Sequence, residues 1–175
     1  MDLIIRKFEL TFKSTDDEIK ELLRQGRLKH FQPILGSGEI YRRRLFLHPE
    51  LVSWMNRLEV DADRKEYFEK VMSLLKAFVI GEDFDDDVVC KLMKPHHHGI
   101  YELRVTFDPQ HRIFGGFLRV GEFVALAQET RDKLSRGQGF AGKISRVDTL
   151  WKSMFSYTPL INERCRLLED FCNED

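Results

Sequence analysis

Four cationic side chains border three predicted strands between residues 100 and 133. Arg104 lies on the first of these strands, Arg112 opens the second, and Arg131 and Lys133 follow the third. An arginine guanidinium is a planar fork that binds two oxygens of a phosphate group and keeps its charge. A lysine ammonium stabilises negative charge or donates a proton. These residue types suit chemistry at a phosphate group if the strands bring them together.

The three strands are predicted from alternation and from turn residues. Apolar and polar residues alternate along 101–108, which is the pattern of a strand with one buried face. Arg104 is therefore expected to point away from the core. Pro109 marks a tight turn before the second apolar run, and Gly121 marks the next turn. The pattern predicts an antiparallel meander.

Hydrophobic periodicity predicts the rest of an α+β fold. The expected strands are 40–47, 88–93, 101–108, 111–120 and 122–128. Two amphipathic helices are expected between Pro49, which suits a first helical turn, and Gly81, and they should cover one face of the sheet. A third helix is expected over 143–155, after a glycine-rich loop that lacks the spacing of a phosphate-binding P-loop.

Both ends of the chain carry additional predicted elements. The alternation of Leu3–Phe12 predicts a strand that joins or abuts the sheet. Thr15 and Glu18 have the spacing of a capping box, which predicts a short helix ending near Gly26, followed by a connector. Near the other end, Asn162 is expected to cap a last helix.

Composition limits the function classes. The 175 residues are 42% hydrophobic and carry a net charge of -1, so the whole chain lacks the basic character typical of nucleic-acid binding. Between residues 101 and 152, however, nine cations face six anions. Three cysteines without a CxxC pair favour reduced thiols in a cytoplasmic protein. No stretch reaches the length of a membrane span.

Three further charged or histidine-rich runs have structural interpretations. Arg42-Arg43-Arg44 suggests an RNA contact, but such runs are usually solvated strand edges. Asp85-Asp86-Asp87 lacks the spacing of an EF-hand and is expected to be a solvated loop. His96-His97-His98 on an extended loop would point in different directions, which disfavours zinc and leaves a role for one histidine as an acid or base beside RNA.

The order of motifs resembles that of the RelE/ParE superfamily of small toxins, in particular its HigB-like, phage-associated branch. The matching pieces are Lys91-Leu92, Tyr101-Glu102-Leu103-Arg104, Arg112-Ile113-Phe114, Val120-Gly121 and Phe123 to Leu126. The resemblance implies a RelE/ParE-like domain over 39–157, with an N-terminal strand-helix extension over 1–38 and a C-terminal helical tail over 158–175. It also implies that strand 40–47 pairs next to a central strand of the meander and not next to 88–93.

The resemblance implies an endoribonuclease that cleaves messenger RNA on the ribosome, without a cofactor or metal, and that is restrained by a cognate antitoxin protein. The residues carried over as catalytic are Arg104, Arg112, Arg131 and Lys133. Those expected to contact RNA are Lys91, Lys94, Arg119, Lys143 and Arg146.

Two departures from the family pattern keep a second function open. The exit segment 128–133 interleaves two anions with its cations, and the chain is not basic overall. Arg104 has an alternative role as a surface residue paired with Glu102 or Glu122, and Arg112 as a strand-edge cation. The alternative function is a phage-type or ParE-like protein without catalysis that binds a protein partner through the same fold.

Overall fold

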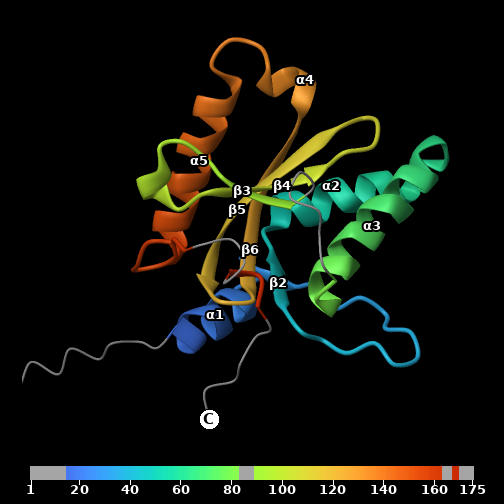
Figure 1. Ribbon diagram of the computed structural model, residues 1–175, viewed down its shortest axis with the longest axis horizontal. Helices are drawn as coiled ribbons and strands as arrows, with labels where there is room; N and C mark the ends of the chain where they lie inside the picture. The colour runs from blue at the N-terminus through green and yellow to red at the C-terminus, as the bar shows by residue number, and fades with distance from the viewer. Residues whose placement is uncertain (1–14, 83–88, 163–166, 170–175) are drawn as a thin grey trace, which may run out of the picture.

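The computed structural model describes residues 15–82, 89–162 and 167–169, and all ranges below refer to these (Figure 1). They form an α+β fold in which helices flank an open, mixed sheet of six strands. The strands are β1 (Lys29–His30), β2 (Arg44–Leu47), β3 (Val89–Leu92), β4 (Tyr101–Val105), β5 (His111–Arg119) and β6 (Glu122–Thr130). The helices are α1 (Thr15–Arg24), α2 (Pro49–Val60), α3 (Lys65–Ile80), α4 (Arg131–Leu134) and α5 (Gly139–Met154).

The sheet has the order β1-β2-β6-β5-β4-β3. The predicted meander is confirmed, because β4, β5 and β6 pair antiparallel in sequence order. β2 pairs with β6 in parallel and not with β3. The expected partner was a central strand of the meander, whereas β6 is the last strand of the meander and becomes central only in the six-stranded sheet.

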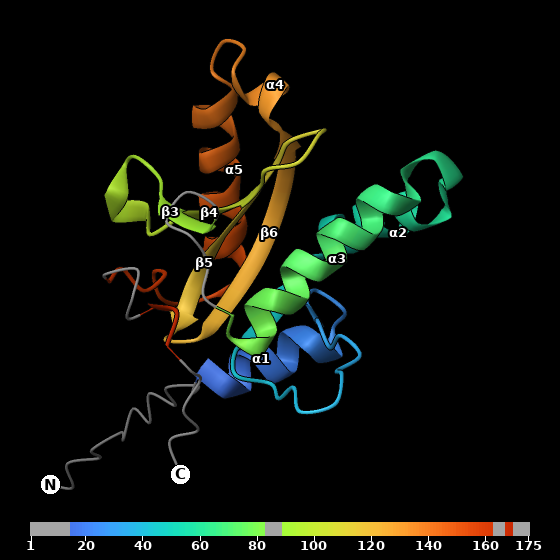
Figure 2. The ribbon, with the colours of Figure 1, turned by 45° about the vertical axis from the view of Figure 1, so that its right-hand side comes forward.

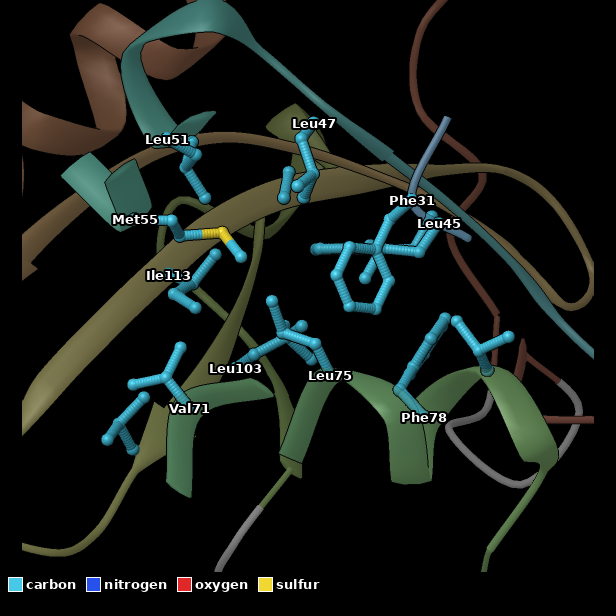
Figure 3. Close-up of a cluster of buried hydrophobic side chains, with 14 of the residues drawn as sticks. Phe31, Leu45, Leu47, Leu51, Met55, Val71, Leu75, Phe78, Leu103 and Ile113 are labelled. Carbon is cyan, nitrogen blue, oxygen red and sulfur yellow. The ribbon is translucent and has the colours of Figure 1, made fainter. Parts of the chain in front are cut away.

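One face of the sheet is covered by the α2 and α3 hairpin, as the periodicity predicted. Leu51 and Met55 of α2 and Leu75 of α3 pack with apolar residues of β2, β4 and β5 in a core that is almost closed to solvent (Figure 3). Gly81 ends α3 in a left-handed conformation with φ of 77°, a conformation that glycine adopts at little cost.

The opposite face is covered by α1 and α5. Figure 2 shows α5 on the other side of β5 and β6 from α2 and α3. Trp151 and Val147 of α5 pack with Phe114 and Val124 of the central strands, and Leu22 of α1 joins the same cluster. The expected helix over 143–155 therefore exists as α5, but it begins four residues earlier and forms the second helical layer.

Several details differ from the expectations. The connector after Gly26 contains the short strand β1, which pairs with β2 because Phe31 next to it is buried in the core. The three histidines form a 3-10 turn and not an extended loop. Thr15 is the first described residue of α1, so the predicted capping box falls at the edge of the described part of the chain.

Other expectations fall on residues that the structure does not describe. These are the strand over Leu3–Phe12, the loop with Asp85-Asp86-Asp87, and most of the last helix. Leu167, near that end, is buried, and its carbonyl accepts a hydrogen bond from the Gly121 amide. None of the helices in the described ranges combines the length and apolar character that crossing a lipid bilayer requires.

Candidate functional site

Arg104 and Arg112 lie directly opposite each other on β4 and β5. Side chains of opposed residues in an antiparallel pair project from the same face of the sheet. Glu102 lies beside both arginines: its Oε1 accepts from Arg104 Nε at 2.8 Å, and its Oε2 lies 3.6 Å from Arg112 Nε. Because Glu102 is only 3% exposed, the two guanidinium groups are held around a buried carboxylate.

A second carboxylate, Glu129, lies opposite Arg112 on β6. Its Oε2 is 3.3 Å from the ammonium of Lys143 on α5, and its Oε1 is 3.4 Å from that of Lys133 on α4. Lys143 also donates a hydrogen bond to the carbonyl of Gln128. These contacts fasten the start of α5 to the end of β6.

Arg131 completes the group from the first position of α4. Its backbone amide donates to the carbonyl of Gln110 at 2.9 Å, and its side chain donates to the Gln110 amide oxygen at 3.2 Å. The group as a whole, called the basic cluster here, consists of five cations and two carboxylates: Arg104, Arg112, Arg131, Lys133 and Lys143, with Glu102 and Glu129. All four residues predicted to be catalytic belong to it.

The chain was compared with family models, curated proteins and solved structures. None of them matches it. The geometry of the site is therefore the guide to its chemistry.

Burial shapes the electrostatics of the basic cluster. Burial lowers the pKa of Arg112. Repulsion from Arg104 and Arg131 lowers this pKa further, whereas attraction to Glu102 raises it. Glu129 shows a balance of effects: burial favours its neutral form, but the hydrogen bond from the Thr130 amide, with Lys143 and Lys133, lowers the pKa of the carboxyl. Arginine stays protonated despite such a shift, so the cluster presents partly dehydrated cations.

A polar depression of about 640 Å³ lies beside the basic cluster, between the β4–β5 turn and α4. Its walls are formed by Asp108, Pro109, Gln110, Thr130, Arg131, Asp132 and Ser135. Only Arg131 among these residues was predicted to belong to a site.

The structure separates two of the predicted RNA contacts from the basic cluster. Arg119, at the far end of β5, forms ion pairs with Asp16 of α1 and with Glu122. Arg146 on α5 pairs with Glu50 of α2. Lys91 lies opposite Glu102 in the β3–β4 ladder and is exposed, as is Lys94. Lys143 therefore belongs to the cluster and Lys91 borders it, whereas Arg119 has an evident structural role.

Glu122 beside Arg119 gives a prediction about pH. Its side chain is fully buried, and burial raises the pKa of the carboxyl above the ordinary 4.5, although Arg119 and Arg44 oppose the shift. A carboxyl with a raised pKa in the folded state stabilises the fold below its unfolded pKa and loses that contribution as the pH rises. We expect Glu122→Gln to gain stability relative to the wild type as the pH rises above the ordinary carboxyl pKa of 4.5.

Urea denaturation at several pH values measures this difference in the free energy of unfolding. Glu69→Gln, at an exposed position of α3, is the matched control and should show no such trend. If Glu122→Gln instead lost stability steadily with rising pH, the ion pair with Arg119 would outweigh burial.

The triple arginine and the triple histidine of the sequence both contact neighbouring helices. Arg43 is buried, and its guanidinium lies 5.7 Å from the ring centre of Phe78, so the middle of the triple arginine packs on α3. His98 Nδ1 lies 3.0 Å from Asp148 of α5. Within the ranges that the structure describes, no group of histidine, cysteine and acidic residues is arranged to hold a metal ion.

The sequence indicated Glu102 only as an alternative ion-pair partner of Arg104, a pairing that the structure shows, and it did not indicate either carboxylate as a member of the site. Glu102 is two residues from Arg104, so alternation alone places it on the same face. Glu129 was noted only as an interruption of the basic exit segment. Its position opposite Arg112 depends on the β5–β6 register, which contains two irregularities that the sequence does not indicate.

Proposed function

We propose that the protein is a toxin-like endoribonuclease of the RelE/ParE superfamily, in its HigB-like branch, which cleaves messenger RNA on the ribosome. The observation that carries the proposal is the cross-strand pair of Arg104 and Arg112, joined through Glu102 and flanked by Lys133, Lys143 and Arg131. Two neighbouring forks of this kind match the oxygens of one phosphate group. The proposal therefore rests on convergence of the motif residues and not on net charge.

The chemistry requires only groups that this chain supplies. The 2'-oxygen of the ribose forms a bond to phosphorus while the bond from phosphorus to the 5'-oxygen breaks. Glu129 accepts the proton of the 2'-hydroxyl and Lys133 gives a proton to the 5'-oxygen, which leaves a cyclic phosphate and a 5'-hydroxyl end. Glu129, whose Oε1 is 3.4 Å from the Lys133 ammonium, then returns its proton to Lys133. In this proposal Arg104 and Arg112 stabilise the charge that develops on the phosphate oxygens, and Lys133 donates the proton.

The charges around the site favour an RNA substrate that is held by another macromolecule. The five cations and two carboxylates of the basic cluster have a net charge of +3. Asp108 and Asp132, which line the neighbouring depression, reduce the net charge of the region to +1. Phosphate contacts supply most of the affinity for free RNA, so affinity for RNA alone should be weak. A ribosome that holds the messenger RNA would make strong affinity for free RNA unnecessary. A cognate antitoxin would act by covering the cluster.

Growth of bacteria tests the proposal directly. Induction of the wild-type protein should arrest growth, whereas induction of Arg104→Ala at the same level should not, because one of the two phosphate-binding forks is lost. Arg57→Ala, on the exposed side of α2, is the control and should remain toxic. Unimpaired growth with the wild type, together with no cleavage on purified ribosomes, would reject the nuclease proposal.

A second candidate is a protein without catalysis that binds a protein partner. The observation that favours it is the pairing of Arg104, Lys133 and Lys143 with carboxylates of the same chain, since a phosphate group must compete with these ion pairs. Growth arrest by the wild type that persists in Arg104→Ala, without messenger cleavage, would favour this candidate.

A further inference from the structure

The polar depression between the β4–β5 turn and α4 has a fixed form. The carbonyl of Pro109 accepts a hydrogen bond from the buried Tyr67 hydroxyl at 2.7 Å and lies 2.9 Å from Nδ1 of His111, which is also buried. This ties the turn to the core beneath it. A pocket whose wall is fixed in advance binds a ligand without a large cost of ordering.

The second wall is joined to the first. Two hydrogen bonds between Arg131 and Gln110 link the two segments that line the depression, and the Ser135 hydroxyl donates to the Arg131 carbonyl. Thr130 caps α4 by accepting from the Lys133 amide. The depression is therefore built from two hydrogen-bonded segments rather than from a loose loop.

The depression adjoins the basic cluster. Arg131 belongs to both, because it lines the depression and its charge acts on Arg112. A nucleotide whose phosphate binds Arg112 and Arg131 would therefore have the depression within reach of its base.

The residues that line the depression have the hydrogen-bonding groups of a base-recognition site. Their carboxylates, Asp108 and Asp132, would discriminate among bases. Guanine alone among the RNA bases carries two adjacent donor groups, N1–H and the N2 amino group, next to the acceptor O6. Carboxylates accept from those donors, and arginine donates to O6 and N7. Asp108, Asp132 and Arg131 supply this combination at the wall of the depression.

We propose that this depression holds the base of the nucleotide whose phosphate binds the basic cluster, and that it prefers guanine. The inference rests on the proposed function for the presence of RNA, but it names a separate set of residues. Arg131 stands at the border and serves both parts, whereas Asp108, Asp132 and Gln110 belong to the depression alone.

Nuclear magnetic resonance of the full, isotope-labelled chain tests the subsite. The probes are guanosine, adenosine, cytidine and uridine monophosphates and inorganic phosphate. Guanosine monophosphate should shift the amide signals of Gln110, Asp132 and Ser135 at a concentration at least about tenfold lower than the other nucleotides. Inorganic phosphate should shift only signals of the cluster, such as those of Arg104 and Arg112.

Variants separate the subsite from general binding. Asp132→Ala should abolish the preference for guanine while phosphate still shifts the Arg112 signal, and Gln110→Ala provides a second test at the other wall. Asp63→Ala, at an exposed position before α3, should behave as the wild type. Dispersed spectra of each variant verify that it is folded.

Equal midpoints for the four nucleotides, or shifts confined to the cluster, would overturn the inference. This failure is distinct from failure of the proposed function. A protein that binds guanosine monophosphate in the depression but never cleaves RNA would retain the subsite and lose the nuclease proposal. A protein that cleaves messenger RNA without any preference for guanine would have the reverse outcome.

Discussion

Under the proposed function, Arg112→Ala is expected to lower the rate of ribosome-dependent messenger cleavage by about a hundredfold or more, which is the usual loss when one preorganised donor to a developing oxyanion is removed. The expectation follows from the position of Arg112. It lies between Arg104 and Glu129 across the sheet and touches Glu102, and its side chain is only 10% exposed. A charge so shielded from water acts more strongly on a bound phosphate than an exposed one.

The measurement compares kcat and KM for cleavage on purified ribosomes in the presence of a chelator. A fall in kcat with little change in KM would indicate a contact made in the transition state. Arg112→Lys keeps the charge but loses the fork, so it should recover only part of the rate. Thermal unfolding distinguishes loss of catalysis from loss of the fold. Equal rates for wild type and Arg112→Ala would remove this residue from the mechanism.

Gly115→Ala is expected to lower the free energy of unfolding by about 3 kcal/mol or more. Gly115 lies on β5 at an irregularity in the pairing with β6. A Cβ atom at this position would collide with the carbonyl oxygen of Val124 and would lie 2.8 Å from the ring of Phe123. The collision involves backbone of a central strand, so no flexible side chain can move aside to relieve it.

Denaturation in urea measures this loss, and Gly142→Ala is the matched control. Gly142 lies within α5 and has open space where its Cβ would be. Alanine should therefore raise the free energy of unfolding there by about 0.5 to 1 kcal/mol. An unchanged stability for Gly115→Ala would mean that β5 and β6 separate easily at this point, contrary to the packed arrangement around Phe123.

The fold class and the elements were largely predictable because they depend on local patterns. The alternation along β4 and the periodicity of α3 each identify an element and its apolar face, although Glu102 on the polar face of β4 is buried as well. The two-residue strand β1 was not predictable, since a strand of that length has no period to detect. Nor could the sequence show that α5 would close the second face of the sheet, because that depends on how distant elements pack.

The site was predictable in part. Motif order led to Arg104, Arg112, Arg131 and Lys133, and the structure brings these four together. The sequence alone did not distinguish Lys143 from Arg119. Lys143 forms an ion pair with Glu129, whereas Arg119 forms ion pairs with Asp16 and Glu122. Those partners lie far away along the chain, so the distinction requires tertiary structure.

The parallel pairing of β2 with β6 has a consequence for the order in which the protein matures during its own synthesis. The ribosome releases β2, α2 and α3 before it has synthesised β6. Leu45 and Leu47 of β2 nevertheless need β6, because β2 joins the rest of the sheet only by pairing with that strand. Contacts between such distant segments form late in folding. Glu129 and Lys133 also arrive with β6 and α4, so a nascent chain still attached to its ribosome carries an unfinished cluster until translation of this part is nearly over.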